Sequence, residues 1–190
     1  MNTKSAILAG FLIGIGGFAY LSVDSPEIGS ALFSLGLMAV IVLGCNLYTG
    51  KVGYIEKSGE IKTLALMCLK NFIGSGFVGL FAGMQYFEKA SKICGVKLGQ
   101  PLYMVFIKAF FCGVMIYLGV ELYKKSKNTL LVVFSIMVFI LCGFEHCVAN
   151  VFYFAAARVF SVQAVILIVV CIIGNAAGSI AVRLLQKHEI

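Results

Sequence analysis

Long apolar segments occupy nearly all of this 190-residue chain. Polar and charged residues separate six of them, at residues 5–23, 28–50, 63–87, 98–123, 129–157 and 159–182. A helix of roughly 20 apolar residues spans the hydrocarbon core of a bilayer, and each segment reaches about that length. The pattern predicts an all-α membrane protein with six transmembrane helices, arranged as a single transmembrane domain over residues 1–190.

The composition excludes an ordinary soluble domain. Hydrophobic residues make up 61% of the chain and charged residues only 12%, whereas a soluble domain carries about 25% charged residues. The net charge of +7 does not indicate a nucleic-acid partner, because most lysines lie between the apolar segments rather than along one basic face. None of the seven cysteines forms a Cys-x-x-Cys pair, so we expect no disulfide framework, metal site or cofactor.

The distribution of lysine and arginine predicts the orientation in the membrane. Loops on the cytoplasmic side are enriched in both residues. With a cytoplasmic N-terminus, nine of them fall on the cytoplasmic side and four on the other. Those four are Lys89, Lys92, Lys97 and Arg158. Both termini are therefore expected in the cytoplasm.

Two of the six segments are interrupted by glycine and polar residues, at residues 44–51 and 143–150. Each is the second segment of its half of the chain, so the two halves are predicted to form an inverted repeat of three helices each. An Asn-x-x-Gly spacing at Asn71 and again at Asn175 echoes this repeat. Interrupted helices at corresponding positions indicate a transport site near the membrane midplane.

Glu145 and His146 lie in the second of these interruptions, between apolar residues. Ionisable side chains are costly inside a bilayer and by default mark a substrate or ion pathway. Neighbours on a helix point about 100° apart, so the two side chains cannot both face one narrow pore. We expect His146 to face the pathway and Glu145 to anchor the interrupted helix, or a neighbouring subunit, through hydrogen bonds.

Three motifs resemble the signatures of the formate/nitrite transporter family. They are Cys-Asn-Leu-Tyr-Thr-Gly at residues 45–50, Gly-Phe-Glu-His-Cys-Val-Ala-Asn at 143–150 and Gly-Asn-Ala-Ala-Gly-Ser at 174–179. The resemblance implies an aquaporin-like protomer in which helices 2 and 5 are interrupted. It also implies a homopentamer with one pore per subunit, embedded in the lipid bilayer of a prokaryotic cytoplasmic membrane.

The same resemblance implies roles for individual residues. Thr49 is similar to the residue that faces the central histidine. One apolar constriction is implied at Phe33, Leu37, Leu47 and Tyr48. A second is implied at Phe139.

Further residues are matched to the pathway or to the scaffold. Lys108 resembles the family's lysine on helix four, where it draws the anion into the pathway, although Gly113 stands where an asparagine is common. Asn150 and Asn175 are expected to support the interrupted helices together with Glu145.

These features imply a channel or proton-linked transporter, not an enzyme, for small monovalent anions of weak acids. Formate, nitrite, hydrosulfide and short carboxylates belong to this class. A bare anion faces a Born penalty of tens of kcal/mol in apolar surroundings, so apolar constrictions block it. A histidine between them can donate a hydrogen bond or a proton, since its reference pKa is about 6.5.

Two other functions remain open from the residues. His146 is a candidate axial ligand in a membrane-embedded haem protein, where the only other histidine, His188, lies in the expected cytoplasmic tail. An aquaporin-like pore for neutral solutes is the second alternative, and the paired Asn-Pro-Ala loops typical of that family are absent.

Overall fold

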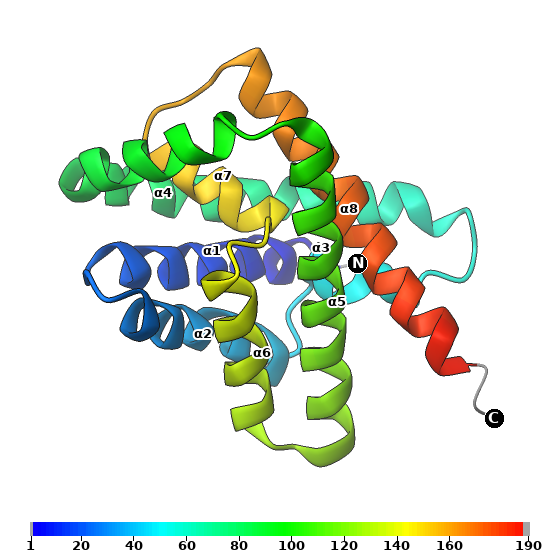
Figure 1. Ribbon diagram of the computed structural model, residues 1–190. Helices are drawn as coiled ribbons and strands as arrows, with labels where there is room; N and C mark the ends of the chain where they lie inside the picture. The colour runs from blue at the N-terminus through cyan, green and yellow to red at the C-terminus, as the bar shows by residue number, and fades with distance from the viewer. Residues whose placement is uncertain (1, 188–190) are drawn as a thin grey trace.

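The computed structural model describes residues 2–187, which form eight α-helices and one short 3-10 helix (Figure 1). They are α1 (Thr3–Leu21), α2 (Pro26–Val42), α3 (Tyr48–Lys51), η1 (Val52–Tyr54), α4 (Glu60–Leu98), α5 (Leu102–Ser126), α6 (Thr129–Leu141), α7 (Cys147–Ala156) and α8 (Val162–Lys187). The predicted all-α class is confirmed. His188, considered above as a haem ligand, lies outside the described residues.

The helices reproduce the six predicted segments. Within the described part of the chain, α1, α4, α5 and α8 are each long and apolar enough to cross a membrane. The other two segments are divided, α2 being followed by α3 and α6 by α7. The breaks fall at residues 43–47 and 142–146, and helix resumes within the polar motifs rather than after them.

One predicted connection is wrong. Residues 88–97 were expected to form a loop because they carry four charges, but α4 continues through them after a non-helical residue at Tyr86 (φ −119°, ψ 25°). Ala90 and Cys94 are buried on one face of this extension, while Glu88 and Lys92 are exposed on the other. The charges belong to the polar face of an amphipathic helix and not to a loop.

The two breaks have the same backbone geometry. Gly44 and Gly143 adopt left-handed conformations, with φ of 64° and 65°. The next residue's N–H bonds back to the carbonyl five residues earlier, Cys45 to Val40 and Phe144 to Phe139, both at 2.9 Å. This is the Schellman ending of an α-helix, in which glycine avoids the steric cost of a positive φ.

The halves of the chain also pack in the same way. In the first half α1 packs against α2 and α4, and in the second α5 packs against α6 and α8, with α2 against α6 joining the halves (Figure 1). Glycines allow the close helix contacts: a Cβ on Gly10 would lie 1.9 Å from the Asn71 carbonyl oxygen, and one on Gly113 would lie 2.1 Å from that of Asn175. Small residues of this kind let helices approach in membranes.

Gly178→Ala is expected to destabilise the fold. A Cβ at this position in α8 would lie 1.9 Å from the Phe110 carbonyl oxygen in α5, so the two helices must separate, at a cost of about 1–3 kcal/mol. Gly95→Ala is the control, because nothing lies within 4 Å of its added Cβ. It should stabilise helix α4 by about 0.5–1 kcal/mol.

Thermal unfolding in detergent, followed with a thiol-reactive fluorophore, measures both variants. The assay suits this chain because six of its seven cysteines are buried and become reactive when the protein unfolds. A Gly178→Ala protein that melted at or above the wild-type temperature would contradict the close α5–α8 contact.

Candidate functional site

Asn71 supports the point where helix resumes in the first half. Its amide oxygen accepts a hydrogen bond from the Tyr48 backbone N–H at 2.8 Å. Its amide nitrogen donates to the carbonyls of Ala6 at 2.7 Å and Asn46 at 2.9 Å. A single buried side chain therefore satisfies backbone groups from α1 and from both sides of the break, which would otherwise be costly to bury.

Asn175 makes the equivalent contacts in the second half. It accepts from the Cys147 N–H at 3.0 Å and donates to the carbonyls of Ala109 and Glu145, both at 2.8 Å. The Asn-x-x-Gly echo in the sequence thus corresponds to a repeated hydrogen-bond pattern. Asn71 was noticed only as part of that echo, and the structure shows the same bracing contacts for it as for Asn175.

His146 and Thr49 meet at the centre of the molecule, between the two breaks. Thr49 Oγ1 lies 2.9 Å from His146 Nε2, and the two residues are only 1% and 2% exposed. His146 is also the N-cap of α7, where its Nδ1 accepts the Ala149 backbone N–H at 3.1 Å. Leu47 occupies the corresponding N-cap position before α3 and makes no side-chain cap.

These contacts fix which nitrogen of the neutral ring carries the proton. Nδ1 accepts from Ala149, so it has no hydrogen in the neutral form, and the ring proton lies on Nε2. The Nε2–H then donates to Thr49 Oγ1. This leaves the Thr49 hydroxyl proton for an acceptor other than the histidine.

Aromatic rings cover His146 on one side. Phe139 stacks on the imidazole with ring centroids 6.0 Å apart and planes 24° apart. Phe33 meets Phe139 edge to face, also at 6.0 Å. Phe33 was expected to share a constriction with Leu37, but it packs on the Phe139 side. The two residues are four positions apart on α2, about one helical turn, and this places them at different depths.

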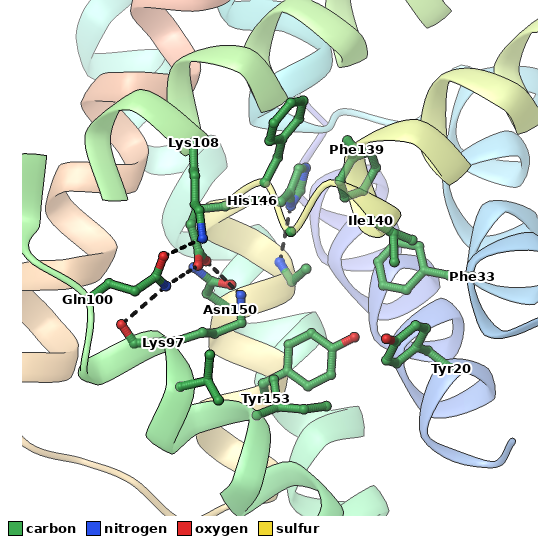
Figure 2. Close-up of a pocket in the computed structure, with 16 residues that line it drawn as sticks. Tyr20, Phe33, Lys97, Gln100, Lys108, Phe139, Ile140, His146, Asn150 and Tyr153 are labelled. Carbon is green, nitrogen blue, oxygen red and sulfur yellow. Dashed lines mark hydrogen bonds and ion pairs between the residues drawn. The ribbon is translucent and has the colours of Figure 1, made fainter. Parts of the chain in front are cut away.

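A cavity of about 250 Å³ opens on the Phe139 side of the histidine. We call it the Lys97 cavity. Its lining includes Lys97, Lys108, Glu145, His146 and Phe139. Figure 2 shows Phe139 beside His146, with the polar side chains of Lys97, Gln100 and Lys108 gathered across from them.

Glu145 points away from the Thr49 contact and anchors the network that borders this cavity. Its carboxylate pairs with Lys97 Nζ at 2.6 Å and accepts from Gln100 Nε2 at 3.0 Å and Asn150 Nδ2 at 2.7 Å. Lys108 Nζ in turn donates to Gln100 Oε1 at 2.5 Å. Glu145 therefore has the hydrogen bonds of an anchor, made within one subunit. Glu145 and His146 both lie in the non-helical break at 142–146, so extended backbone rather than helix geometry directs the two side chains apart.

Lys97 and Gln100 are the residues that the sequence analysis missed. Lys97 was expected in a loop, and it is instead the direct partner of a carboxylate that is 1% exposed. The available signal was the three- and four-residue spacing of Ala90, Cys94 and Lys97, which continues the inward face of α4. Lys108 does line the cavity, but its ammonium contacts Gln100 and not the Glu145 carboxylate. The Lys108 carbonyl accepts the Glu145 backbone N–H at 3.4 Å.

A second cavity, of about 440 Å³, lies on the opposite side of the centre. We call it the Lys124 cavity. Leu37 and Leu47 form part of its wall and are 2% and 1% exposed. Apolar side chains thus lie on both sides of the His146–Thr49 pair.

Tyr48 lies outside both cavities. Its hydroxyl donates to the Ile172 carbonyl in α8 at 3.2 Å, and its ring lines an apolar groove with residues of α4 and α8. The predicted place of Tyr48 in a constriction does not match this position. The side chain of Thr49, the next residue along α3, is the one that faces the histidine.

The arrangement does not fit a haem ligand. Both ring nitrogens of His146 are already engaged, Nδ1 by Ala149 and Nε2 by Thr49. An axial bond to iron would have to displace one of these contacts in a site where His146 is 2% exposed.

Sequence comparison gives two useful relatives. The uncharacterized transporter YrhG of Bacillus subtilis is 31% identical over 154 residues, which cover 70% of this chain and 58% of that protein. The formate channel FocA of Haemophilus influenzae is 26% identical over 146 residues, which cover 66% of this chain and 51% of that protein. The matched part of the chain spans a little over half the length of each relative.

Two solved structures share the fold. An FNT family ion channel superposes with a TM-score of 0.88 at 21% identity, covering 98% of this chain and 88% of the other. A pentameric formate channel with formate bound gives 0.81 at 21% identity, covering 98% and 94%. The predicted aquaporin-like fold is confirmed, and the relatives are channels and transporters rather than enzymes. The family model described as Formate/nitrite transporter matches residues 3–186, so this multi-pass membrane protein belongs to the formate/nitrite transporter family.

Proposed function

We propose that the chain is a channel or transporter for small monovalent anions of weak acids, with formate, nitrite and hydrosulfide as the leading substrates. The observation that carries the proposal is the buried His146–Thr49 pair, which lies between two apolar layers, with His146 in the wall of the Lys97 cavity and Leu47, two residues before Thr49, in the wall of the Lys124 cavity. The relatives named as formate channels support this substrate class.

The polar pair supplies hydrogen bonds at the buried depth where an anion would lose its water. The Lys97 cavity brings together two lysines, Lys97 and Lys108, and the rings of Phe33 and Phe139. Burying the charge of an anion behind these rings without new partners would cost several kcal/mol or more. The Thr49 hydroxyl offers a donor at that depth, and the His146 Nε2–H offers a second when the anion replaces Thr49 Oγ1 as its acceptor. A hydrogen bond to a charged group contributes about 1.5–3 kcal/mol.

The capping contact favours one of the two roles considered for His146. A second ring proton would have to sit on Nδ1, where it would meet the Ala149 N–H instead of accepting from it. The geometry therefore supports hydrogen-bond donation by the neutral ring more than storage of a second proton. In this role His146 orients and stabilises the anion through a hydrogen bond.

Assembly and location are part of the same proposal. A homopentamer in a prokaryotic cytoplasmic membrane is supported by the pentameric channel of the same fold and by the bacterial source of the transporters. Cytoplasmic termini are supported by the lysine distribution. Lys97 is half-buried and paired with Glu145, so only three of the four cations assigned to the other side remain as loop or surface charges. A single channel domain over residues 1–190 completes the proposal.

A substrate panel in proteoliposomes tests the substrate class. Formate, nitrite and hydrosulfide are expected to cross faster than in empty vesicles, whereas sulfate and glycerol are not. Sulfate carries two charges across the apolar layers, and glycerol offers no charge for the lysines to attract. Stopped-flow light scattering and anion-sensitive dyes measure these rates. Glycerol permeation equal to that of formate would favour the neutral-solute alternative instead.

A further inference from the structure

The Lys124 cavity gathers three lysines at one mouth of the pathway. Lys51 comes from the end of α3, and Lys124 and Lys127 come from the end of α5 and its cap. Among the described residues that line this cavity there is no carboxylate. The Lys97 cavity differs, because Glu145 lies in its wall and offsets one of its two lysines.

The position of Lys124 is fixed by its neighbours. Its Nζ lies 3.5 Å from the centre of the Tyr54 ring and donates to Glu121 Oε1 at 3.0 Å. The Tyr54 hydroxyl donates to the same carboxylate oxygen, and Glu121 is not part of the cavity wall. Within residues 2–187, no ion pair is found for Lys51 or Lys127. The mouth therefore keeps a net positive charge after Glu121 is counted.

The wall toward the centre decides what can pass. Leu37 and Leu47 close the cavity on that side and are almost fully buried. A multiply charged anion can bind lysines as point charges at the mouth. It would have to lose the hydration of two or more charges to pass the leucines, and this penalty grows steeply with charge. Binding and passage are thus separated for such an anion.

We propose that the Lys124 cavity is a binding site for a multiply charged phosphate-class anion, which occupies the mouth without crossing and lowers the flux of monovalent substrates. The blocking step rests on the proposed transport function, whereas the binding step does not. The cavity volume of about 440 Å³, against about 250 Å³ on the other side, leaves room for an anion larger than the transported ones.

Inorganic pyrophosphate is the probe, and binding to the detergent-solubilised full chain is measured by isothermal titration calorimetry. The cavity variant is Lys51→Gln with Lys127→Gln, which removes two charges and leaves Lys124 and its contacts with Tyr54 and Glu121 in place. We expect its pyrophosphate dissociation constant to rise about tenfold. Lys57→Gln with Lys62→Gln is the matched control, because both lysines are exposed and lie outside the cavity.

Flux measurements then test the block. Pyrophosphate on both sides of the vesicle should slow formate flux through the wild type and the control but not through the cavity variant. Potassium chloride at the same ionic strength corrects for screening.

Equal pyrophosphate affinity in the cavity and control variants would overturn the proposed binding site. Lysine-dependent binding with unchanged formate flux would overturn the block. Lysine-dependent binding in a protein without formate, nitrite or hydrosulfide flux would support the site and reject the transport function.

Discussion

His146→Asn is expected to lower formate flux about 10- to 100-fold while the protein stays folded. Asparagine is a favourable N-cap residue, so its amide oxygen replaces Nδ1 as acceptor for the Ala149 N–H. Its side chain is too short to replace Nε2 opposite Thr49, so the donor in the pathway is lost. The substitution thus separates the two contacts of the histidine.

His146→Leu is the comparison for this variant. Leu47 occupies the equivalent N-cap position before α3 without a side-chain cap, so leucine is compatible with such a break. At position 146, leucine would remove both hydrogen bonds of the histidine. We expect the flux to fall as in His146→Asn and the stability to fall by about 1 kcal/mol more, through the lost cap. Flux is measured in proteoliposomes and stability by thermal unfolding. Wild-type formate flux in a folded His146→Asn protein would remove the histidine from the mechanism.

Glu145→Ala is expected to have the largest effect on stability. The Lys97 ammonium, on a side chain only 14% exposed, would lose its carboxylate, and Gln100 and Asn150 would each lose an acceptor. Removing one partner of a buried ion pair costs about 3–5 kcal/mol. We expect little folded protein in detergent, measured as loss of the monodisperse peak in size-exclusion chromatography and as early reaction of the buried cysteines.

A double variant distinguishes an unpaired charge from a general packing defect. Lys97→Met with Glu145→Gln removes both charges, and the glutamine oxygen still accepts from Asn150. It should recover much of the lost stability, since the buried ammonium is gone. Lys89→Met provides a surface control, because the Asp24 partner of Lys89 is fully exposed. A double variant no more stable than Glu145→Ala would show that the unpaired Lys97 charge does not cause the loss of stability.

The sequence was most informative where one physical rule acts alone. Segment length and hydropathy predicted six crossings because backbone groups in a bilayer must be bonded within helices. The glycine and polar motifs located both breaks, since Gly44 and Gly143 each supply the positive φ that ends a helix. The Asn-x-x-Gly echo reflected the matching contacts of Asn71 and Asn175.

Contacts that depend on the relative depth and rotation of helices were not predictable in the same way. Lys97 was predicted in a loop because residues 88–97 carry several charges. Charge content does not distinguish a loop from an amphipathic helix at a membrane surface, and this segment is part of α4. The depth of Phe33 depends on how α2 packs against α6, which no residue pattern states. The Tyr48 side chain points toward α8, and α3 begins at that residue. The motif locates the break but does not state at which residue helix resumes, so the direction of the Tyr48 side chain could not be predicted.

Formate efflux from proteoliposomes tests the central claim most directly. Wild type, His146→Asn and empty vesicles are compared at matched protein density, with the folded state of the variant checked by thermal unfolding. The structure predicts wild-type efflux well above that of empty vesicles and His146→Asn efflux close to it. Wild-type efflux no faster than that of empty vesicles, or equal efflux through wild type and variant, would contradict the role of the His146–Thr49 pair.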